Sequence, residues 1–354
     1  MDAFKIGDKT ILCTKKRGVA GYAIEGLRIY RIKVESTPGF STNVYLILDS
    51  EAILVDVGSH AAKVIADLKK GFDIINKDFK EDVGLGDISN VIITHGHGDH
   101  FAGLSHQELM DKRVYVHPLD GNHICGYTAF YHQWIRGDEE LAKEAGLEGG
   151  VDLSDMWGDM WKPDSFAARL TEADLINAVD GQEILNGYKV YHTPGHSSGH
   201  ICLKVGPFLF LGDHILSFTM PHLIPTSIEN GAGLKLYLDS LRKISELGEI
   251  LGLAGHGQTI YPLKERIQQI ESSHHKRMGE LVELCQTERN LYQLTNEYYR
   301  RHSVLIRAPS IDELVDAEKA LALEEIKSYV EYLLESNRLI VSGIDNCVPR
   351  YCSA

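Results

Sequence analysis

Apolar and polar residues alternate with a period of two in the first part of the chain, as expected of half-buried strands. The clearest example covers residues 27–34. Two apolar runs at 43–48 and 52–57 flank a polar turn and predict a β-hairpin, and a helix is expected at 61–72. Further strands are expected at 89–94, 113–117, 188–192, 201–205 and 208–211. This order predicts an α/β fold built as a layered sandwich.

A helical pattern interrupts the strands at about 118–180, and this insertion holds all three tryptophans. Two apolar stripes follow helical spacing, one formed by Tyr127, Phe130, Tyr131 and Trp134, the other by Met156, Trp157, Met160 and Trp161. The aromatic helices could cover a site as a lid, pack the insertion's own core or form a dimer interface. These alternatives remain open at this point.

The carboxyl-terminal part reads as helices over 264–302 and 320–336, followed by a hairpin of strands 338–341 and 347–351. A length of 354 residues suits two domains, and we place them at 1–263 and 264–354. The second domain is expected to be small and winged-helix-like.

The composition is that of a globular protein, with 44% hydrophobic residues and a net charge of −14. An acidic surface repels phosphate backbones, so nucleic acid is disfavoured as a partner. No apolar run is long enough to span a membrane, and the amino terminus does not resemble a secretory signal. We therefore expect a cytoplasmic protein whose six scattered cysteines are reduced.

The densest chemical signal is the segment Thr-His-Gly-His-Gly-Asp-His at 94–100. Three more candidate ligands follow predicted strands and lie beside glycines. The full candidate set is His95, His97, Asp99, His100, His196, Asp213 and His256. Imidazole and carboxylate ligands suit zinc, iron or manganese, and the lack of cysteine favours a catalytic over a structural site.

These motifs resemble the metallo-β-lactamase superfamily over roughly residues 25–260, which implies an αββα sandwich with a two-metal site at one edge. By that resemblance, Asp213 bridges the two ions, and Asp56 orients a ligand histidine. The first ion would be held by His95, His97 and His196, and the second by Asp99, His100 and His256. The expected cofactors are two divalent ions, zinc first, with iron or manganese as alternatives.

The mechanism that the resemblance implies is attack by a hydroxide that bridges the two ions. Asp99 would both ligate and accept a proton. His214, beside Asp213, is predicted to be a second catalytic residue, either facing the substrate in the pocket or supporting a metal ligand from behind. Four further histidines, His117, His123, His132 and His200, are expected to be packed or at the surface, and His222 is a loop candidate at the border of the pocket.

The carboxyl-terminal module resembles that of a superfamily branch containing thioesterase-like hydrolases and a single-strand endoribonuclease. Its main helix is acidic, with Glu324, Glu325, Glu331 and Glu335, so we expect it to form a wall of the active site or a dimer contact. Basic spots at 15–17 and 276–277 could meet coenzyme A phosphates or be solvated faces.

We therefore expect a dinuclear metal-dependent hydrolase that cleaves a thioester or ester. An acyl-CoA-type thioester is the first choice, with a small-molecule acyl substrate as its partner and a homodimer left open. The alternatives are a phosphodiesterase or endoribonuclease on the same scaffold, an acyl lactonase, and a non-enzymatic metal-bound ligand-binding protein.

Overall fold

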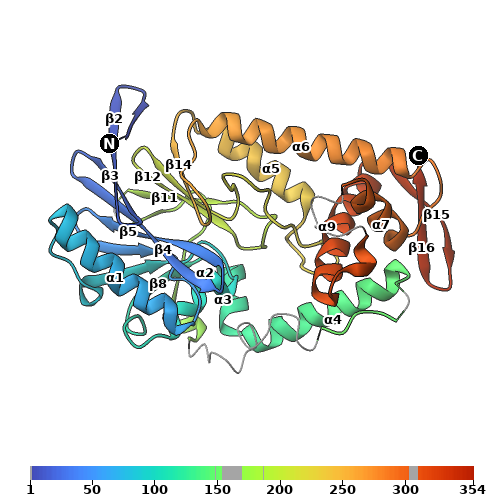
Figure 1. Ribbon diagram of the computed structural model, residues 1–354, viewed down its shortest axis with the longest axis horizontal. Coiled ribbons are helices and arrows are strands. Elements are labelled where there is room, and N and C mark those ends of the chain that lie inside the picture. Colours follow the sequence, from blue (N-terminus) through green and yellow to red (C-terminus); the bar gives the residue numbers. More distant parts are fainter. Residues whose placement is uncertain (1, 148, 154–169, 186, 303–309) are drawn as a thin grey trace.

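Two β-sheets lie face to face in the computed structural model, which describes residues 2–147, 149–153, 170–185, 187–302 and 310–354 (Figure 1). The larger sheet follows chain order as β1 (Asp2–Ile6), β2 (Lys9–Lys16), β3 (Val19–Ile24), β4 (Leu27–Thr37), β5 (Phe40–Leu48), β6 (Ala52–Val55), β7 (Ile88–Ile92), β8 (Arg113–Val116) and β9 (Leu175–Asn177). The smaller sheet consists of β10 (Glu183–Ile184), β11 (Tyr188–His192), β12 (Ile201–Val205), β13 (Phe208–Gly212) and β14 (Leu251–Ala254).

Helices cover the outer faces of both sheets (Figure 1). In chain order they are α1 (Ala62–Phe79), α2 (Gly98–Phe101), α3 (Pro118–Cys125), α4 (Tyr127–Ala145), α5 (Leu234–Ser245), α6 (Leu263–Leu284), α7 (Leu291–Arg301) and α9 (Asp316–Glu335). Helix α1 packs on the larger sheet, and α5 and α6 lie over the smaller one. The predicted αββα sandwich is confirmed.

Strand β5 shows why the central strands are nearly continuous runs of apolar residues. Val44 and Leu46 belong to the hydrophobic cluster under α1, whereas Tyr45 and Ile47 belong to the cluster between the two sheets. All four side chains are almost fully buried. Because both faces of the strand are covered, successive residues must be apolar even though they point in opposite directions.

Most predicted elements appear close to their expected bounds, but the helix predicted at 61–72 continues to Phe79. Gly71 lies inside this helix and faces strand β4. A Cβ atom on Gly71 would lie 2.6 Å from Cγ2 of Ile32, so the glycine allows the helix to approach the sheet closely. Several short strands had not been assigned from the sequence pattern, among them β1, β2, β3, β9 and β10.

Strand direction brings several chain segments to the same edges of the sheets. β6, β7 and β8 run parallel to one another in the larger sheet. In the smaller sheet, β11, β13 and β14 share one direction, because β12 is antiparallel to both β11 and β13. The loops that follow these strands therefore leave each sheet on one side, where α/β proteins commonly place their sites.

The carboxyl-terminal part contains α7, α9 and the hairpin of β15 (Leu339–Asp345) and β16 (Val348–Ser353), with the long helix α6 leading into it (Figure 1). One hydrophobic cluster joins Leu211 of β13 and Tyr237 of α5 to Leu323 of α9. A continuous core therefore crosses the predicted domain boundary at 263/264, and that division stays a prediction. Within the described residues, no helix combines the length and apolar character that crossing a membrane requires.

Lys276 and Arg277, considered above as a basic pair for coenzyme A phosphates, differ in burial: Lys276 is exposed and Arg277 is buried. Arg277 is 7% exposed, pairs with Glu325 of α9 and donates from Nε to Tyr298 Oη over 2.8 Å. The guanidinium also lies over the rings of Tyr298 and Tyr329. The phosphate-binding alternative is therefore wrong for Arg277, whose charge is used inside the protein.

Replacing Arg277 with methionine should lower the free energy of unfolding by about 2 kcal/mol, because Glu325 would lose its cationic partner in a mostly enclosed position. The matched control is Lys276→Met. The Lys276 side chain is 76% exposed, so this change should cost less than about 0.5 kcal/mol. Urea denaturation of both variants measures the difference, and equal midpoints would contradict the internal role of Arg277.

Candidate metal centre

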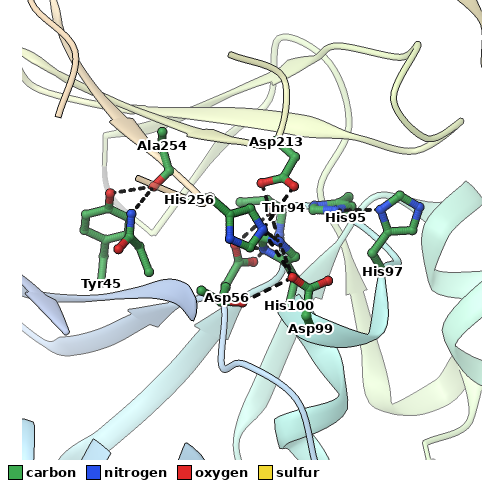
Figure 2. Close-up of polar contacts among 12 residues, drawn as sticks. Tyr45, Asp56, Thr94, His95, His97, Asp99, His100, Asp213, Ala254 and His256 are labelled. Carbon is green, nitrogen blue, oxygen red and sulfur yellow. Dashed lines mark hydrogen bonds and ion pairs between the residues drawn. The ribbon is translucent and has the colours of Figure 1, made fainter. Parts of the chain in front are cut away.

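Four loops at the strand ends bring the seven candidate ligands together. The segment 95–100 follows β7, and the loops after β11, β13 and β14 carry His196, Asp213 and His256. All seven side chains are buried or nearly so. Figure 2 shows His95, His97, Asp99, His100, Asp213 and His256 converging from both sheets. The structure thus assembles one centre from residues spread over more than 160 positions of the chain.

His95, His97 and His196 form the first group of ligand atoms. His95 Nε2 lies 3.1 Å from His97 Nδ1 and 3.3 Å from His196 Nε2. Burial lowers the pKa of His95 well below its usual value, and the neighbouring imidazoles act in the same direction. The rings are therefore neutral, which is the form that binds a metal.

Asp99, His100 and His256 form the second group. His256 Nε2 lies 3.2 Å from both Asp99 Oδ2 and His100 Nε2. Asp213 stands between the groups, with Oδ2 3.2 Å from His256 Nε2 and 3.8 Å from His196 Nε2. This is the place from which one carboxylate can reach ions in both groups.

The charges of the centre fit a divalent cation. Asp213 Oδ1 is buried and has no hydrogen-bond partner within the described residues. Burial opposes a charge on His256, but Asp213 and Asp99 outweigh it and raise its pKa to about 10. The carboxylates thus favour positive charge where the ligand atoms converge, and imidazole and carboxylate donors suit a transition-metal ion.

Asp56 connects the two groups through hydrogen bonds behind the ligands (Figure 2). Its Oδ2 accepts from His100 Nδ1 at 2.8 Å and from Thr94 Oγ1 at 2.9 Å, and Thr94 Oγ1 lies 3.0 Å from His95 Nδ1. Asp56 has a φ of 57°, a left-handed conformation that aspartate tolerates better than most residues. One carboxylate therefore orients a ligand from each group, which extends the predicted role of Asp56.

Backbone carbonyls orient two further ligands. His196 Nδ1 donates to the carbonyl of His222, and His256 Nδ1 donates to the carbonyl of Ser41, each over 2.8 Å. Both bonds direct Nε2 toward the ion positions. The sequence carried no signal for these partners, because every residue type supplies a carbonyl.

Two glycines allow the side chains of the metal centre and their neighbours to lie close to the backbone of the ligand loops. A Cβ atom on Gly255 would lie 2.4 Å from Asp213 Oδ1 and 2.8 Å from His100 Cε1. Gly212 has a φ of 47°, and its Cβ would lie 2.6 Å from His200 Nε2. The glycines noted beside the ligands in the sequence thus leave room for neighbouring side chains.

His214 does not lie where the sequence analysis placed it. Its side chain is fully buried, with ring centroids 5.1 Å from Tyr237 and 5.9 Å from His200. Burial lowers its pKa to about 3, so the ring is neutral. It does not line the cavity at the metal centre, so the expected substrate-facing position is wrong. Its position gives the predicted catalytic role no support.

A cavity of about 280 Å³ opens onto the metal centre. His97, Asp99, His196, Asp213 and His256 form its polar side. The apolar walls are Phe40, Tyr127, Phe130, Trp134, Ile224 and Leu321. The aromatic face of α4 therefore covers the site, as the lid alternative expects, and Tyr127 and Tyr131 also pack into the core of the larger sheet rather than into a core of the insertion alone. The second stripe, from Met156 to Trp161, lies outside the described residues.

Helix α9 contributes directly to this cavity, as the expectation of an active-site wall required. Leu321 lines it, and Glu324, one turn later, is fully buried. Glu324 accepts from Trp134 Nε1 at 2.7 Å and lies 2.5 Å from His222 Nε2. Glu324 therefore does not present charge to a solvent-filled groove. No local signal links Trp134 to a glutamate 190 positions later.

Replacing Asp56 with asparagine should weaken metal binding about 10- to 100-fold, because the ligand histidines lose a charged acceptor while the left-handed backbone is still tolerated. Competition with a chromophoric chelator measures the affinity. Asp111→Asn, at an exposed position, is the control and should bind metal as the unaltered protein does. Equal affinity in both variants would contradict the role of Asp56.

Known proteins share both the sequence pattern and the fold. The profile of the metallo-beta-lactamase superfamily matches residues 37–256. The probable metallo-hydrolase YqjP of Bacillus subtilis is 28% identical over 232 residues, which cover 64% of this chain and 70% of that protein. An atrochrysone carboxyl ACP thioesterase of Aspergillus fumigatus is 26% identical over 51% of this chain and 42% of its own length.

A crystal structure of a metallo-beta-lactamase family protein from Thermus thermophilus superposes with a TM-score of 0.70 and 21% identity, covering 94% of this chain and 99% of that one. The similarity extends through the carboxyl-terminal helices. The relatives include proteins named as hydrolases, and the buried histidine and aspartate groups are what a metal-dependent hydrolase requires. The chain therefore belongs to the metallo-β-lactamase superfamily and is a metal-dependent hydrolase.

Proposed function

We propose that this protein hydrolyses an acyl thioester or ester, with an acyl-CoA-type thioester as the first choice and two zinc ions as cofactors. The observation that carries this proposal is the cavity in which ligand residues face aromatic and aliphatic walls. Such a cavity can hold an apolar acyl or aryl group with its carbonyl at the metal centre. The relative named as a thioesterase supports the same choice of bond.

The size of the cavity favours an acyl group over a whole coenzyme. Its volume of about 280 Å³ is at the lower limit of pockets for drug-sized ligands, which span roughly 300–1,000 Å³. The acyl portion would occupy this space, and the carrier would remain outside. The net charge of −14 makes a nucleic-acid strand the less favoured substrate, because an acidic protein repels a phosphate backbone.

The protein's own residues would position and deprotonate the reactants. When bound, divalent ions polarise the scissile carbonyl and lower the pKa of a water molecule. Asp99 lines the cavity, and Thr42 Oγ1 donates to its Oδ2 over 3.2 Å. Burial opposes ionisation of Asp99, but His100 and His256 hold its pKa at about 2. This carboxylate is therefore ionised and can accept the proton of the attacking water at Oδ1.

Turnover of a substrate panel tests the proposal. The zinc-loaded protein should hydrolyse acyl-CoA thioesters or the matching acyl esters, and His97→Ala should lose metal and at least about 1,000-fold in kcat/KM while its circular dichroism spectrum is retained. His132→Ala, an exposed histidine on α4, is the control and should remain active.

The panel also contains acyl lactones, single-stranded RNA and a chromogenic phosphodiester. Cleavage of RNA or the phosphodiester, with inert thioesters and esters, would overturn the proposed bond class. Ring opening of lactones alone would replace the proposal with a lactonase. Full activity of His97→Ala with its metal content unchanged would refute the assignment of the centre itself.

Glu324 should control how the cavity accepts the acyl group, because it fixes Trp134 and His222 in the wall. Glu324→Ala leaves the indole N–H without its acceptor, and we expect KM for bulky acyl substrates to rise about tenfold, with a smaller change in kcat. Glu324→Gln retains an acceptor for the indole N–H, so most of the increase in KM should be absent in this variant. The exposed Glu335→Ala on the same helix is the control, and the same KM change there would contradict this role.

A further inference from the structure

A second group of titratable side chains lies beside the metal centre but belongs to neither set of ligands. Asp120 and His123 stand on α3, and Glu229 stands in the loop before α5. His123 Nδ1 lies 3.9 Å from Asp120 Oδ1 and 4.0 Å from Glu229 Oε1. We call these three residues the α3 cluster. The sequence analysis placed His123 among packed or surface residues and did not single out the two acids.

The α3 cluster buries negative charge that the described protein groups do not balance. Asp120 is fully buried, Glu229 is 6% exposed, and no lysine or arginine of the described residues forms an ion pair with either. Glu229 Oε2 is buried and has no hydrogen-bond partner among the described groups. Burial, with Asp120 nearby, raises the pKa of Glu229 to about 7. A bound cation would offset the free-energy cost of burying these two carboxylates.

The donors and their spacing suit a transition-metal ion. One imidazole and two carboxylates are the donor types found at zinc sites, where ligand atoms bound at about 2.0–2.2 Å lie about 3.4 Å apart in a tetrahedron. The three ligand atoms already lie within 4.8 Å of one another, and His123 Nδ1 would have to move about half an ångström closer to each carboxylate to reach that spacing. A neighbouring cavity of about 140 Å³, lined by both His123 and Glu229, has room for a water molecule as the fourth ligand.

We propose that Asp120, His123 and Glu229 bind a further divalent transition-metal ion, separate from the catalytic centre. The same carboxylates hold the loops that carry catalytic ligands. Asp120 Oδ2 accepts from Gly96 N and Ser197 Oγ, both at 2.7 Å. The other contacts are Gly199 N to Asp120 Oδ1 and Ser198 N to Glu229 Oε1, each 2.6 Å. The ion would thus brace the 95–100 and 196–200 loops from behind.

Metal content measures this site without reference to any substrate. The full-length protein is saturated with zinc, passed through a desalting column and analysed by plasma mass spectrometry. His123→Ala should carry one ion fewer per chain than the unaltered protein. Gln133→Ala, which lines the same small cavity without belonging to the α3 cluster, should carry the full number.

Glu229→Gln keeps the shape of the side chain and provides a second, independent variant. It should lose the same ion, and crystals of the unaltered protein should show an anomalous peak at the zinc edge between Asp120, His123 and Glu229. Equal metal counts in all four proteins, or no anomalous peak at that position, would overturn the proposal. The α3 cluster would then be balanced by a proton, while the proposed hydrolase function would be unaffected.

Discussion

Buried negative charge at the edge of the sandwich is the constraint on which the site depends. Asp99 and Asp213 lie where loops from two sheets meet, nearly closed to water. Such charge is tolerated only beside cations, and the surrounding imidazoles are held with their ligand nitrogens toward it. Asp56 maintains that orientation for one histidine of each group. Because Asp56 follows β6 and its partner Thr94 follows β7, the orientation of the metal ligands depends on the pairing of these two strands.

The carboxyl-terminal helices belong to the active site as much as to their own core. Leu321 closes the apolar side of the cavity, and Glu324 anchors the tryptophan that lines it. His222 joins both systems, since its ring meets Glu324 and its carbonyl accepts from the ligand His196. A change in α9 can therefore reach the substrate cavity and one metal ligand through two hydrogen bonds, which is why the proposed acyl specificity is assigned to α9 together with α4.

The central strands and the ligand motif could be predicted because their signals are local. Both faces of β5 are buried, so its apolar run is visible in the sequence, and the clustered histidines at 95–100 need glycines between them. The helix predicted at 61–72 was too short, and the glycine inside it, Gly71, is explained only by its close contact with Ile32 of the neighbouring strand. His214 was misplaced because its neighbour Asp213 does reach the cavity, whereas the His214 ring points into the core.

The sequence by itself determined the sandwich class, the ligand residues and the chemistry those residue types allow, because strand periodicity and donor chemistry are properties of short segments. Only the tertiary structure decided which acidic side chains are buried and which residues they contact. Glu324 was noted only for the acidity of its helix, yet it holds Trp134, and Asp120 gave no signal although it connects two ligand loops. The reason is physical: burial and hydrogen-bond partnership arise from contacts between segments far apart in the chain, which no local pattern encodes.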